Sequence, residues 1–410
     1  MNILIIHKYF LSKGEPGISR FNQLVKYWSS FGYKITVIAG TMHHMTGDSG
    51  RQRYKRKFLT KEIIDSNVTV FRTYVSAEYN KNFFRRFLSY ATFLFSSTIV
   101  GLFWSGKQDL VIATSPPLSV GITGYIISLF KRIPLVFEVR DLWPDFAIDA
   151  KILRNKLLIK IFLSLEKFIY KKAKLINVLT PAFEKVLIEK KKVPKEKIIY
   201  IPNGADLDLM SPGPRENAAS LKYGWQDKFV ILYVGAHGLA NNLDLIIDGA
   251  NLLKDYKDFL FVLIGDGMLK QDLIKRANNL NLNNVLFLDS VSKEEIVHYI
   301  NASDICVAVL KKIYDTTYPN KVFDYMSCAK PIVVSIDGTV AKLVEEESKS
   351  GLHSKAEDVS DFKEAIMKMY KDKNLRDIYG KNGYAYVKDN FSREVLAKKY
   401  ENELKKLVIK

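Results

Sequence analysis

The stretch KFVILYVGAHGLANNLDLIIDGANLL (residues 228–253) contains the pattern that decides the fold. Residues 228–234 form an apolar run of strand length, and a turn with a glycine at each end, Gly235 to Gly238, follows it. Apolar residues then recur at helical spacing, at Leu243, Ile246, Ile247, Ala250 and Leu253. A buried strand that leads through a tight turn into an amphipathic helix is the building unit of a parallel sheet covered by helices.

Both halves of the chain repeat this pattern. Apolar runs of strand length are found near 2–7, 34–39, 68–72, 109–113, 134–139, 174–179 and 197–201, and again near 228–234, 259–264, 285–288, 305–309 and 331–335. Because these runs are almost continuously apolar and alternate with helical patterns, they predict parallel sheets buried on both faces. A turn-rich segment at 203–220 separates the halves, so we expect two α/β domains.

The composition favours an anionic partner. The 410 residues include 62 lysines and arginines against 44 acids, a net charge of +18. The basic residues are concentrated in 51–57, 151–174 and 185–197, which are either anion-binding surfaces or ordinary solvated helix faces. We find no stacking platform or recognition helix for nucleic acid, and we therefore expect phosphorylated ligands or anionic lipid as partners.

Two cysteines, Cys306 and Cys328, are too few for a zinc cluster and suit a reducing compartment. Asp206 and Asp208 form a DxD pattern, but they follow a Pro-Asn-Gly turn, and we do not expect a metal there. The first residues, MNILIIHKYF, have no basic leader and predict a buried strand, not a signal peptide.

Residues 88–106 contain 19 positions without a charge, which is long enough for a bilayer span. Against a span, Ser89, Thr92 and Ser96 form a polar stripe at helical spacing, and predicted sheet strands lie on both sides of the segment. An ordinary buried helix is one alternative. We favour a helix that packs partly on its domain and partly in the membrane interface, beside the aromatic residues and two arginines that precede it.

Two glycine-containing turns mark candidate phosphate sites. Gly14 to Gly17 follows the first predicted strand, and Gly235 to Gly238 occupies the same place in the second half. Helix N-termini after parallel strands favour phosphate, although neither turn is a GxGxxG or P-loop motif and each also fits a simple tight turn. The turn at 265–267 is interpreted as structural.

The segment 138–145, EVRDLWPD, places Arg140 and Asp141 at the end of an apolar strand, where active-site groups of such sheets collect. Trp143 and Pro144 supply a rigid wall beside them. A structural ion pair between Arg140 and Asp141 is the alternative.

Taken together, the motifs resemble those of the GT-B glycosyltransferases, specifically the large retaining family 4 (GT4) and its branch of WbuB-like bacterial transferases for O-antigen and capsule precursors. The resemblance lies in EPGISRF (15–21), SPP (115–117), VRDLWPD (139–145), IPNGAD (201–206), YVGAHG (233–238), IGDG (264–267) and PNKVFDYMSCAKP (319–331). It implies a GT-B fold with two Rossmann-like domains whose parallel sheets face each other across a cleft. Residues 1–205 would bind the acceptor and 206–390 the nucleotide-sugar, and the helix in 391–410 would cross back to the first domain.

The resemblance also implies roles for individual residues. Family members carry two acids eight residues apart in this region. The second acid, which usually binds the donor ribose, corresponds to Asp324, and the first falls at Thr316 next to Asp315. The arginine and lysine that usually follow the first turn of the second domain are replaced near Ala236, Asn241 and Asn242. The expected donor-binding residues are Gly17, Gly235, Gly238, Asn320, Lys321 and Asp324.

For catalysis the resemblance and the strand-end position together favour Asp141, Arg140 and Lys321, and for the acceptor Arg20 and Trp143. The implied reaction moves a sugar, such as the N-acetylated 6-deoxyhexosamine FucNAc, from a UDP-sugar to an undecaprenyl-diphosphate-linked saccharide, with retention. It needs no metal or other cofactor. The expected location is cytoplasmic, peripheral on the inner face of the plasma membrane and bound to its anionic surface. A catalytically idle sugar-nucleotide-binding subunit is the rival interpretation.

Overall fold

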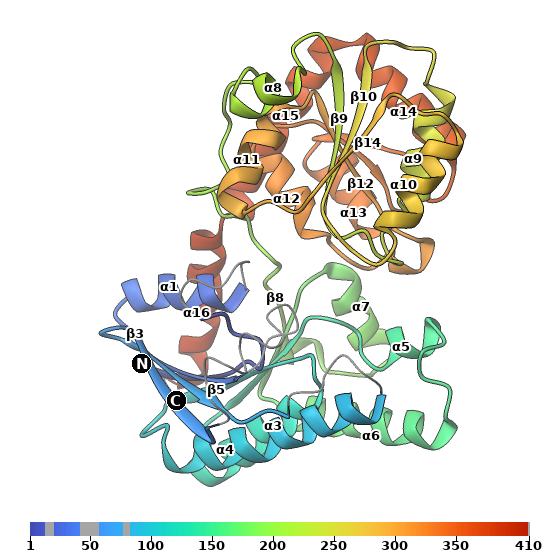
Figure 1. Ribbon diagram of the computed structural model, residues 1–410. Coiled ribbons are helices and arrows are strands. Elements are labelled where there is room, and N and C mark those ends of the chain that lie inside the picture. The colour runs from blue at the N-terminus through green and yellow to red at the C-terminus, as the bar shows by residue number, and fades with distance from the viewer. Residues whose placement is uncertain (13–19, 42–56, 77–82, 409–410) are drawn as a thin grey trace. The chain divides into compact units, whose positions relative to one another are not determined.

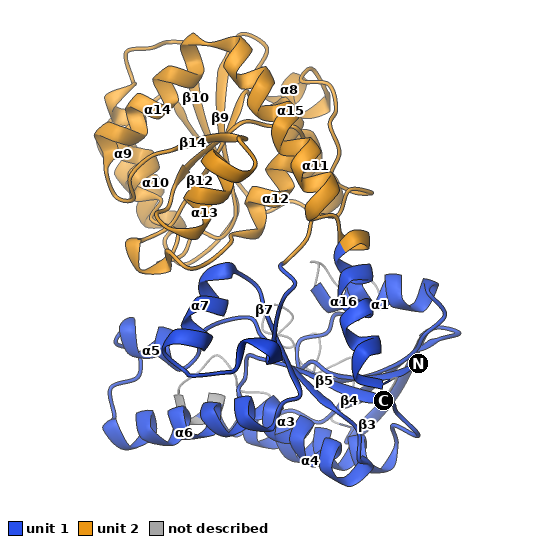
Figure 2. Ribbon diagram, turned by 180° about the vertical axis from the view of Figure 1, so that it is seen from behind, with its two compact units in different colours: residues 1–202, 396–410 blue, residues 203–395 orange. Residues whose placement is uncertain are grey.

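The computed structural model describes residues 1–12, 20–41, 57–76 and 83–408 (Figure 1). It divides into two compact units, residues 1–202 with 396–410 and residues 203–395 (Figure 2). Gly14, Gly17 and nearly all of the basic cluster 51–57 lie outside the described residues.

The first unit is built on an eight-stranded sheet with the order β3-β4-β2-β1-β5-β6-β7-β8. Its strands are β1 (Asn2–Ile6), β2 (Lys34–Gly40), β3 (Leu59–Asp65), β4 (Val68–Thr73), β5 (Leu110–Thr114), β6 (Leu135–Val139), β7 (Leu175–Val178) and β8 (Ile198–Tyr200). All neighbours pair in parallel except β3, which runs antiparallel to β4. The parallel strands are those that the apolar runs predicted.

Helices cover both faces of this sheet (Figure 1). One face carries α3 (Phe83–Phe103), α4 (Ser119–Lys131), α6 (Lys156–Lys172) and α7 (Pro181–Glu189), and the other carries α1 (Arg20–Ser30) and α16 (Arg393–Val408). The last helix belongs to this unit from Leu396 onward. Trp28 of α1 donates a hydrogen bond to the carbonyl of Ala397 at 3.0 Å and packs edge-on against Tyr400.

The second unit has a six-stranded, fully parallel sheet with the order β11-β10-β9-β12-β13-β14. Its strands are β9 (Phe229–Val234), β10 (Phe259–Ile264), β11 (Val285–Leu288), β12 (Ile305–Val309), β13 (Ile332–Ser335) and β14 (Gly351–His353). The longer helices are α8 (Ala218–Tyr223), α9 (Asp244–Leu252), α10 (Lys270–Asn279), α11 (Lys293–Ala302), α12 (Asn320–Ser327), α14 (Val359–Lys371) and α15 (Lys373–Asn390). The predicted α/β class with two parallel sheets is confirmed.

Two strands carry no clear sequence signal. β3 is an edge strand whose residues are mostly solvent-facing, and β14 has only three residues. An apolar run marks a strand only where both faces are covered, so edge and very short strands escape this criterion.

The polar stripe of α3 faces inward. Ser89 is buried and accepts a hydrogen bond from Lys8 Nζ at 2.8 Å, and Ser96 donates to the carbonyl of Tyr74 at 2.8 Å. Phe95 and Phe103 are instead 67% and 75% exposed. None of the helices within the described residues is both long and apolar enough to cross a membrane.

Candidate functional site

At the carboxyl end of the second sheet, two glycine turns press against each other. Gly235 after β9 and Gly265 after β10 have φ values of +147° and +151°, and a Cβ on Gly265 would lie 1.9 Å from the carbonyl oxygen of Gly235. The two turns are also joined by a 2.8 Å hydrogen bond from the His237 amide to the Asp266 carbonyl. Only glycine allows this approach. The two turns therefore present backbone atoms without side chains at this edge of the sheet.

Lys321, in the first turn of α12, places its side chain over the Gly235 turn. Its Nζ lies 3.7 Å from the ring centre of Tyr233 and 2.8 Å from the point that a Cβ on Gly235 would occupy. The nitrogen is buried and has no hydrogen-bond partner among the described residues. Burial lowers the pKa of Lys321 to about 7. An ammonium without a counterion in this position is a receptor for an anionic group.

The predicted ribose ligand, Asp324, lies one turn further along α12. Its carboxylate forms a 3.3 Å ion pair with Lys293, the first residue of α11, and both side chains are about one-fifth exposed. A half-open pair of this kind leaves carboxylate lone pairs for a hydroxyl group. Lys293 had no motif of its own, and only the packing of α11 beside α12 brings it to this carboxylate.

The other donor-side candidates are more open. Asn320 is exposed and Gly238 is half-buried, with Asn241 Nδ2 as the nearest neighbour of a hypothetical Cβ at 3.9 Å. Asp315 is exposed, and its carbonyl oxygen accepts a 2.9 Å hydrogen bond from the amide of Thr339. Asp315 therefore has a carboxylate at the surface of this unit, next to the position where Thr316 replaces the family's first acid.

His237 is a residue that sequence reasoning missed, although it stands inside the first glycine turn. It is fully buried, and neither ring nitrogen has a partner among the described residues. Burial, and then the positive charge of Lys270, lower the pKa of His237 to about 4, so the ring is neutral at pH 7. Lys270 itself donates to the carbonyls of Gly265 and Leu288 and thereby fixes the second turn.

The acceptor-side candidates lie on the first unit. Asp141 is exposed just beyond the end of β6, and Arg140 is half-buried with an Nε that has no partner among the described residues. Trp143 packs edge-on against Phe162 of α6 at 4.5 Å between ring centres. No ion pair between Arg140 and Asp141 is found in the described part of the chain.

Arg20 has a different position from the one expected of an acceptor ligand. Its guanidinium is buried, pairs with Glu138 at 3.1 Å and donates to the carbonyls of Ile201 and Pro202. Asn177 joins the same network through Glu138 and Ile201. These contacts connect α1 with the ends of β6, β7 and β8, and they use the guanidinium for the internal structure of this unit.

Over the described ranges, no group of three or more His, Cys, Asp and Glu residues is arranged to hold a metal ion. The donor-side residues Gly235, Gly238, Asn320, Lys321 and Asp324 all belong to the second unit.

Comparison with known families agrees with this division. Residues 17–204 match the glycosyl transferase 4-like domain, and residues 218–386 match the family of glycosyl transferases group 1.

Two curated relatives are about one-quarter identical to this chain over the residues that align. An uncharacterized glycosyltransferase of Methanocaldococcus jannaschii is 26% identical over 62% of this chain and 64% of its own length. A putative teichuronic acid biosynthesis glycosyltransferase of Bacillus subtilis, TuaH, is 24% identical over 50% and 51%. The chain thus aligns with about half to two-thirds of the length of these relatives.

Among solved structures, the Anabaena protein HepE in complex with UDP superimposes with a TM-score of 0.73 at 17% identity. The match covers 99% of this chain and all of HepE. At this identity the similarity shows the fold alone.

Proposed function

Since the chain carries a glycosyl transferase 4-like domain followed by a glycosyl transferases group 1 domain on a GT-B fold, we propose that it transfers a sugar from a UDP-sugar to a lipid-linked saccharide. The class of the enzyme, a GT-B glycosyltransferase, is the premise. The donor, the acceptor, the retention of configuration and the independence from metal are the proposal.

The observation that carries the donor assignment is the position of Lys321. Its ammonium is buried above Gly235 without a counterion among the described residues. The diphosphate of a nucleotide-sugar would supply that counterion, and the amide groups at the start of α12 would add partial positive charge. HepE, which has the same fold, was solved with UDP bound.

In the proposed reaction the bond between the sugar C1 and the diphosphate oxygen breaks, and the acceptor oxygen forms the new bond on the same face. The acceptor proton passes to the leaving phosphate. Negative charge develops on that phosphate, so the ammonium of Lys321 acts where stabilisation is most effective. Asp324 holds the ribose, and Asp141 with Arg140 orients the acceptor hydroxyl or the reacting sugar.

We place the acceptor in bacterial surface polysaccharide synthesis and the enzyme on the cytoplasmic face of the membrane. TuaH, a putative teichuronic acid glycosyltransferase, supports the first point. The outward-facing Phe95 and Phe103 of α3 support the second, because aromatic side chains enter the interface between lipid and water. An N-acetylated 6-deoxyhexosamine is our proposed donor sugar.

The test is calorimetric binding of UDP, GDP and ADP to the full chain, with Lys321→Met and Asp324→Ala beside it. We expect UDP to bind preferentially, and each variant to weaken binding by about tenfold or more, the loss of one charged hydrogen bond. Lys342→Met, an exposed lysine of the same unit, should leave the affinity unchanged.

Absence of nucleotide binding in the presence of lipid would reject the donor assignment. Selective UDP binding without turnover on any lipid-linked acceptor would instead favour the catalytically idle subunit.

A further inference from the structure

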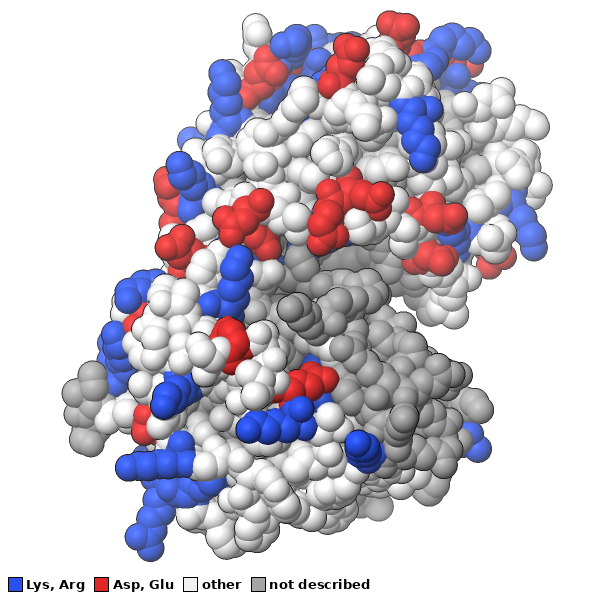
Figure 3. Space-filling view, turned by 60° about the vertical axis from the view of Figure 1, so that its left-hand side comes forward, with Lys and Arg blue, Asp and Glu red and all other residues white. Residues whose placement is uncertain are grey.

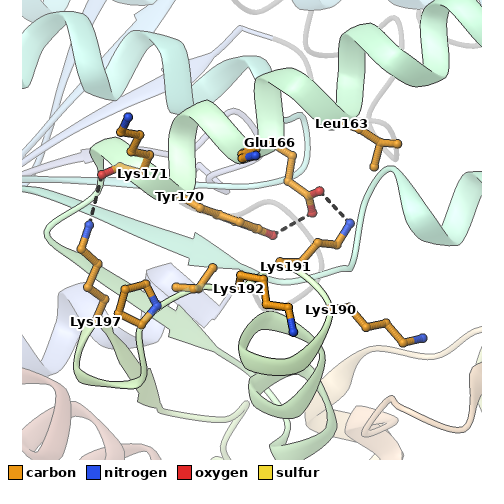
Figure 4. Close-up of a pocket in the computed structure, with 11 residues that line it drawn as sticks. Leu163, Glu166, Tyr170, Lys171, Lys190, Lys191, Lys192 and Lys197 are labelled. Atoms are coloured by element: carbon orange, nitrogen blue, oxygen red, sulfur yellow. Dashed lines mark hydrogen bonds and ion pairs between the residues drawn. The ribbon is translucent and has the colours of Figure 1, made fainter.

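A pocket of about 580 Å³ lies within the first unit, between α6 and the loop that joins α7 to β8 (Figure 4). Six of its lining residues are lysines: Lys167, Lys171, Lys190, Lys191, Lys192 and Lys197. Glu166 is the single acidic residue of the lining. These lysines come from two segments that the sequence showed only as basic clusters.

One of the six charges is neutralised inside the unit. Lys191 forms ion pairs with Glu166, at 2.8 Å, and with Asp145. Tyr170 donates a 3.0 Å hydrogen bond to the same glutamate from the other side (Figure 4). The two carboxylates are therefore already engaged and hold Lys191 in place.

The other five lysines form no ion pair with any described residue. Lys197 donates to the carbonyl oxygens of Lys171 and Ala173, both at 3.1 Å, and these acceptors carry no charge. Lys190 and Lys192 are exposed, and neither forms an ion pair with any residue that the structure describes. Five of the six lysines therefore lack an ion-pair partner among the described residues, and the six lysines with Glu166 and Asp145 leave a net charge of about +4.

Such a cluster is stable only at a cost, because like charges around one cavity repel each other. The backbone adds to this cost at Lys192, which has a φ of +57°, a conformation that glycine adopts more easily. A compact ligand with several negative charges would remove the repulsion. Phosphate and diphosphate groups fit this description, and lysine binds them as a point charge.

One end of the pocket lies apart from Asp141, and its other end adjoins the segment that carries Asp141 through the ion pair of Lys191 with Asp145. Lys171 precedes the start of β7, and Lys197 precedes the start of β8, so this end of the pocket lies at the amino ends of the strands. Asp141 follows the carboxyl end of β6. In a parallel sheet these are opposite edges.

We propose that this lysine pocket binds a phosphate or diphosphate group, at a site additional to the donor and acceptor sites. The group has two chemical sources. One is a free anion such as pyrophosphate. The other is the headgroup of an anionic lipid, which the exposed Leu157 and Ile161 on the outer side of α6 would also suit.

The experiment uses the full chain and the variant Lys190→Gln/Lys192→Gln. The matched control, Lys368→Gln/Lys371→Gln, removes two exposed lysines from α14 of the other unit. One arm measures calorimetric binding of inorganic pyrophosphate. The second measures flotation with vesicles of phosphatidylcholine that contain phosphatidic acid.

We expect the pocket variant to bind its anion about tenfold more weakly, a change of about 1.4 kcal/mol, while the control stays within about twofold of the unchanged chain. Weakening in the pyrophosphate arm assigns a free anion, and weakening in the vesicle arm alone assigns a lipid headgroup. Equal behaviour of the two variants in both arms, or no binding in either, would overturn the proposal.

Two further measurements separate the pocket from the rest of the molecule. UDP binding should be the same in the pocket variant and the unchanged chain, because this proposal goes beyond the transferase site. The single variant Lys192→Gly should be at least as stable to heat, since it relieves the backbone, and should still bind the anion more weakly. A loss of UDP binding in the pocket variant would show that the pocket is not a separate site.

Discussion

At the scale of the residue, Lys321 gives the donor site a dependence on pH. The folded protein holds its pKa near 7, whereas an ordinary lysine titrates near 10.5. Between these values the unfolded chain binds more protons, so this residue makes the second unit more stable as pH rises through that window. A bound diphosphate has the opposite preference, because it favours the charged lysine.

We therefore predict that UDP binds most tightly below pH 7 and loses more than about tenfold in affinity by pH 8.5. Calorimetry at several pH values, in two buffers of different ionisation enthalpy, measures both the affinity and the proton taken up. Lys321→Arg should remove the dependence, since arginine stays charged throughout. A pH profile that is identical in Lys321→Arg would contradict the assignment.

Arg20 illustrates the limit of residue types as a guide. The sequence placed an arginine next to a glycine turn, and an acceptor ligand was a reasonable interpretation. The structure engages its guanidinium with Glu138 and two carbonyl groups of the same unit. A motif names the residue, but its partners come from strands that lie more than a hundred positions away.

At the scale of the element, the two glycine turns act as one piece. We predict that Gly265→Ala destabilises the second unit by about 3 kcal/mol or more, because the Cβ would overlap a backbone oxygen and the φ is positive. Gly238→Ala is the matched control, since a Cβ there meets nothing closer than 3.9 Å and the amide is kept. Denaturant unfolding measures the difference. Equal stability of the two variants would show that the turns can move apart.

Helix α3 has its polar stripe on the inside and large aromatic residues on the outside. We predict that Phe95→Ser/Phe103→Ser lowers flotation with anionic vesicles several-fold and leaves UDP binding intact, because both rings are mostly exposed. High salt should release the unchanged chain from the same vesicles. Leu252→Ser/Met268→Ser, two exposed apolar residues of the second unit, serves as the control. Flotation that responds equally to both pairs would argue against α3 as the membrane contact.

At the scale of the whole molecule, the positive charges that give the net charge of +18 are not spread evenly over the surface. Figure 3 shows a face on which lysine and arginine side chains lie among aspartates and glutamates. The lysine pocket accounts for about four of these charges. Net charge alone therefore suggests a class of partner and does not locate the site that would bind it.

The first unit is completed by the end of the chain. Leu396, Ala397, Tyr400 and Leu404 of α16 are buried against α1. We predict that truncation after Val395 costs the first unit more than about 3 kcal/mol, through lost burial of these side chains, and leaves the second unit folded. Amide hydrogen exchange follows the two units separately. Equal loss of protection in both units would contradict this division.

The sequence by itself determined the fold class and the position of the glycine turn after β9. The alternation of apolar runs and helical patterns records which faces are buried, and it is sufficient to predict two parallel sheets with helices on both sides. The glycines at positions 235 and 265 mark the place where the turns after β9 and β10 come into backbone contact.

Only the tertiary structure decided which side chains meet. In the folded chain Lys293 pairs with Asp324, and Lys321 has no counterion among the described residues. The serines of α3 face inward, and lysines from α6 and from the loop that joins α7 to β8 surround one pocket. Periodicity encodes the burial of a residue, which is a local quantity. The partners of a charge depend on segments that are distant in the sequence, and their positions follow only from the packing of the whole unit.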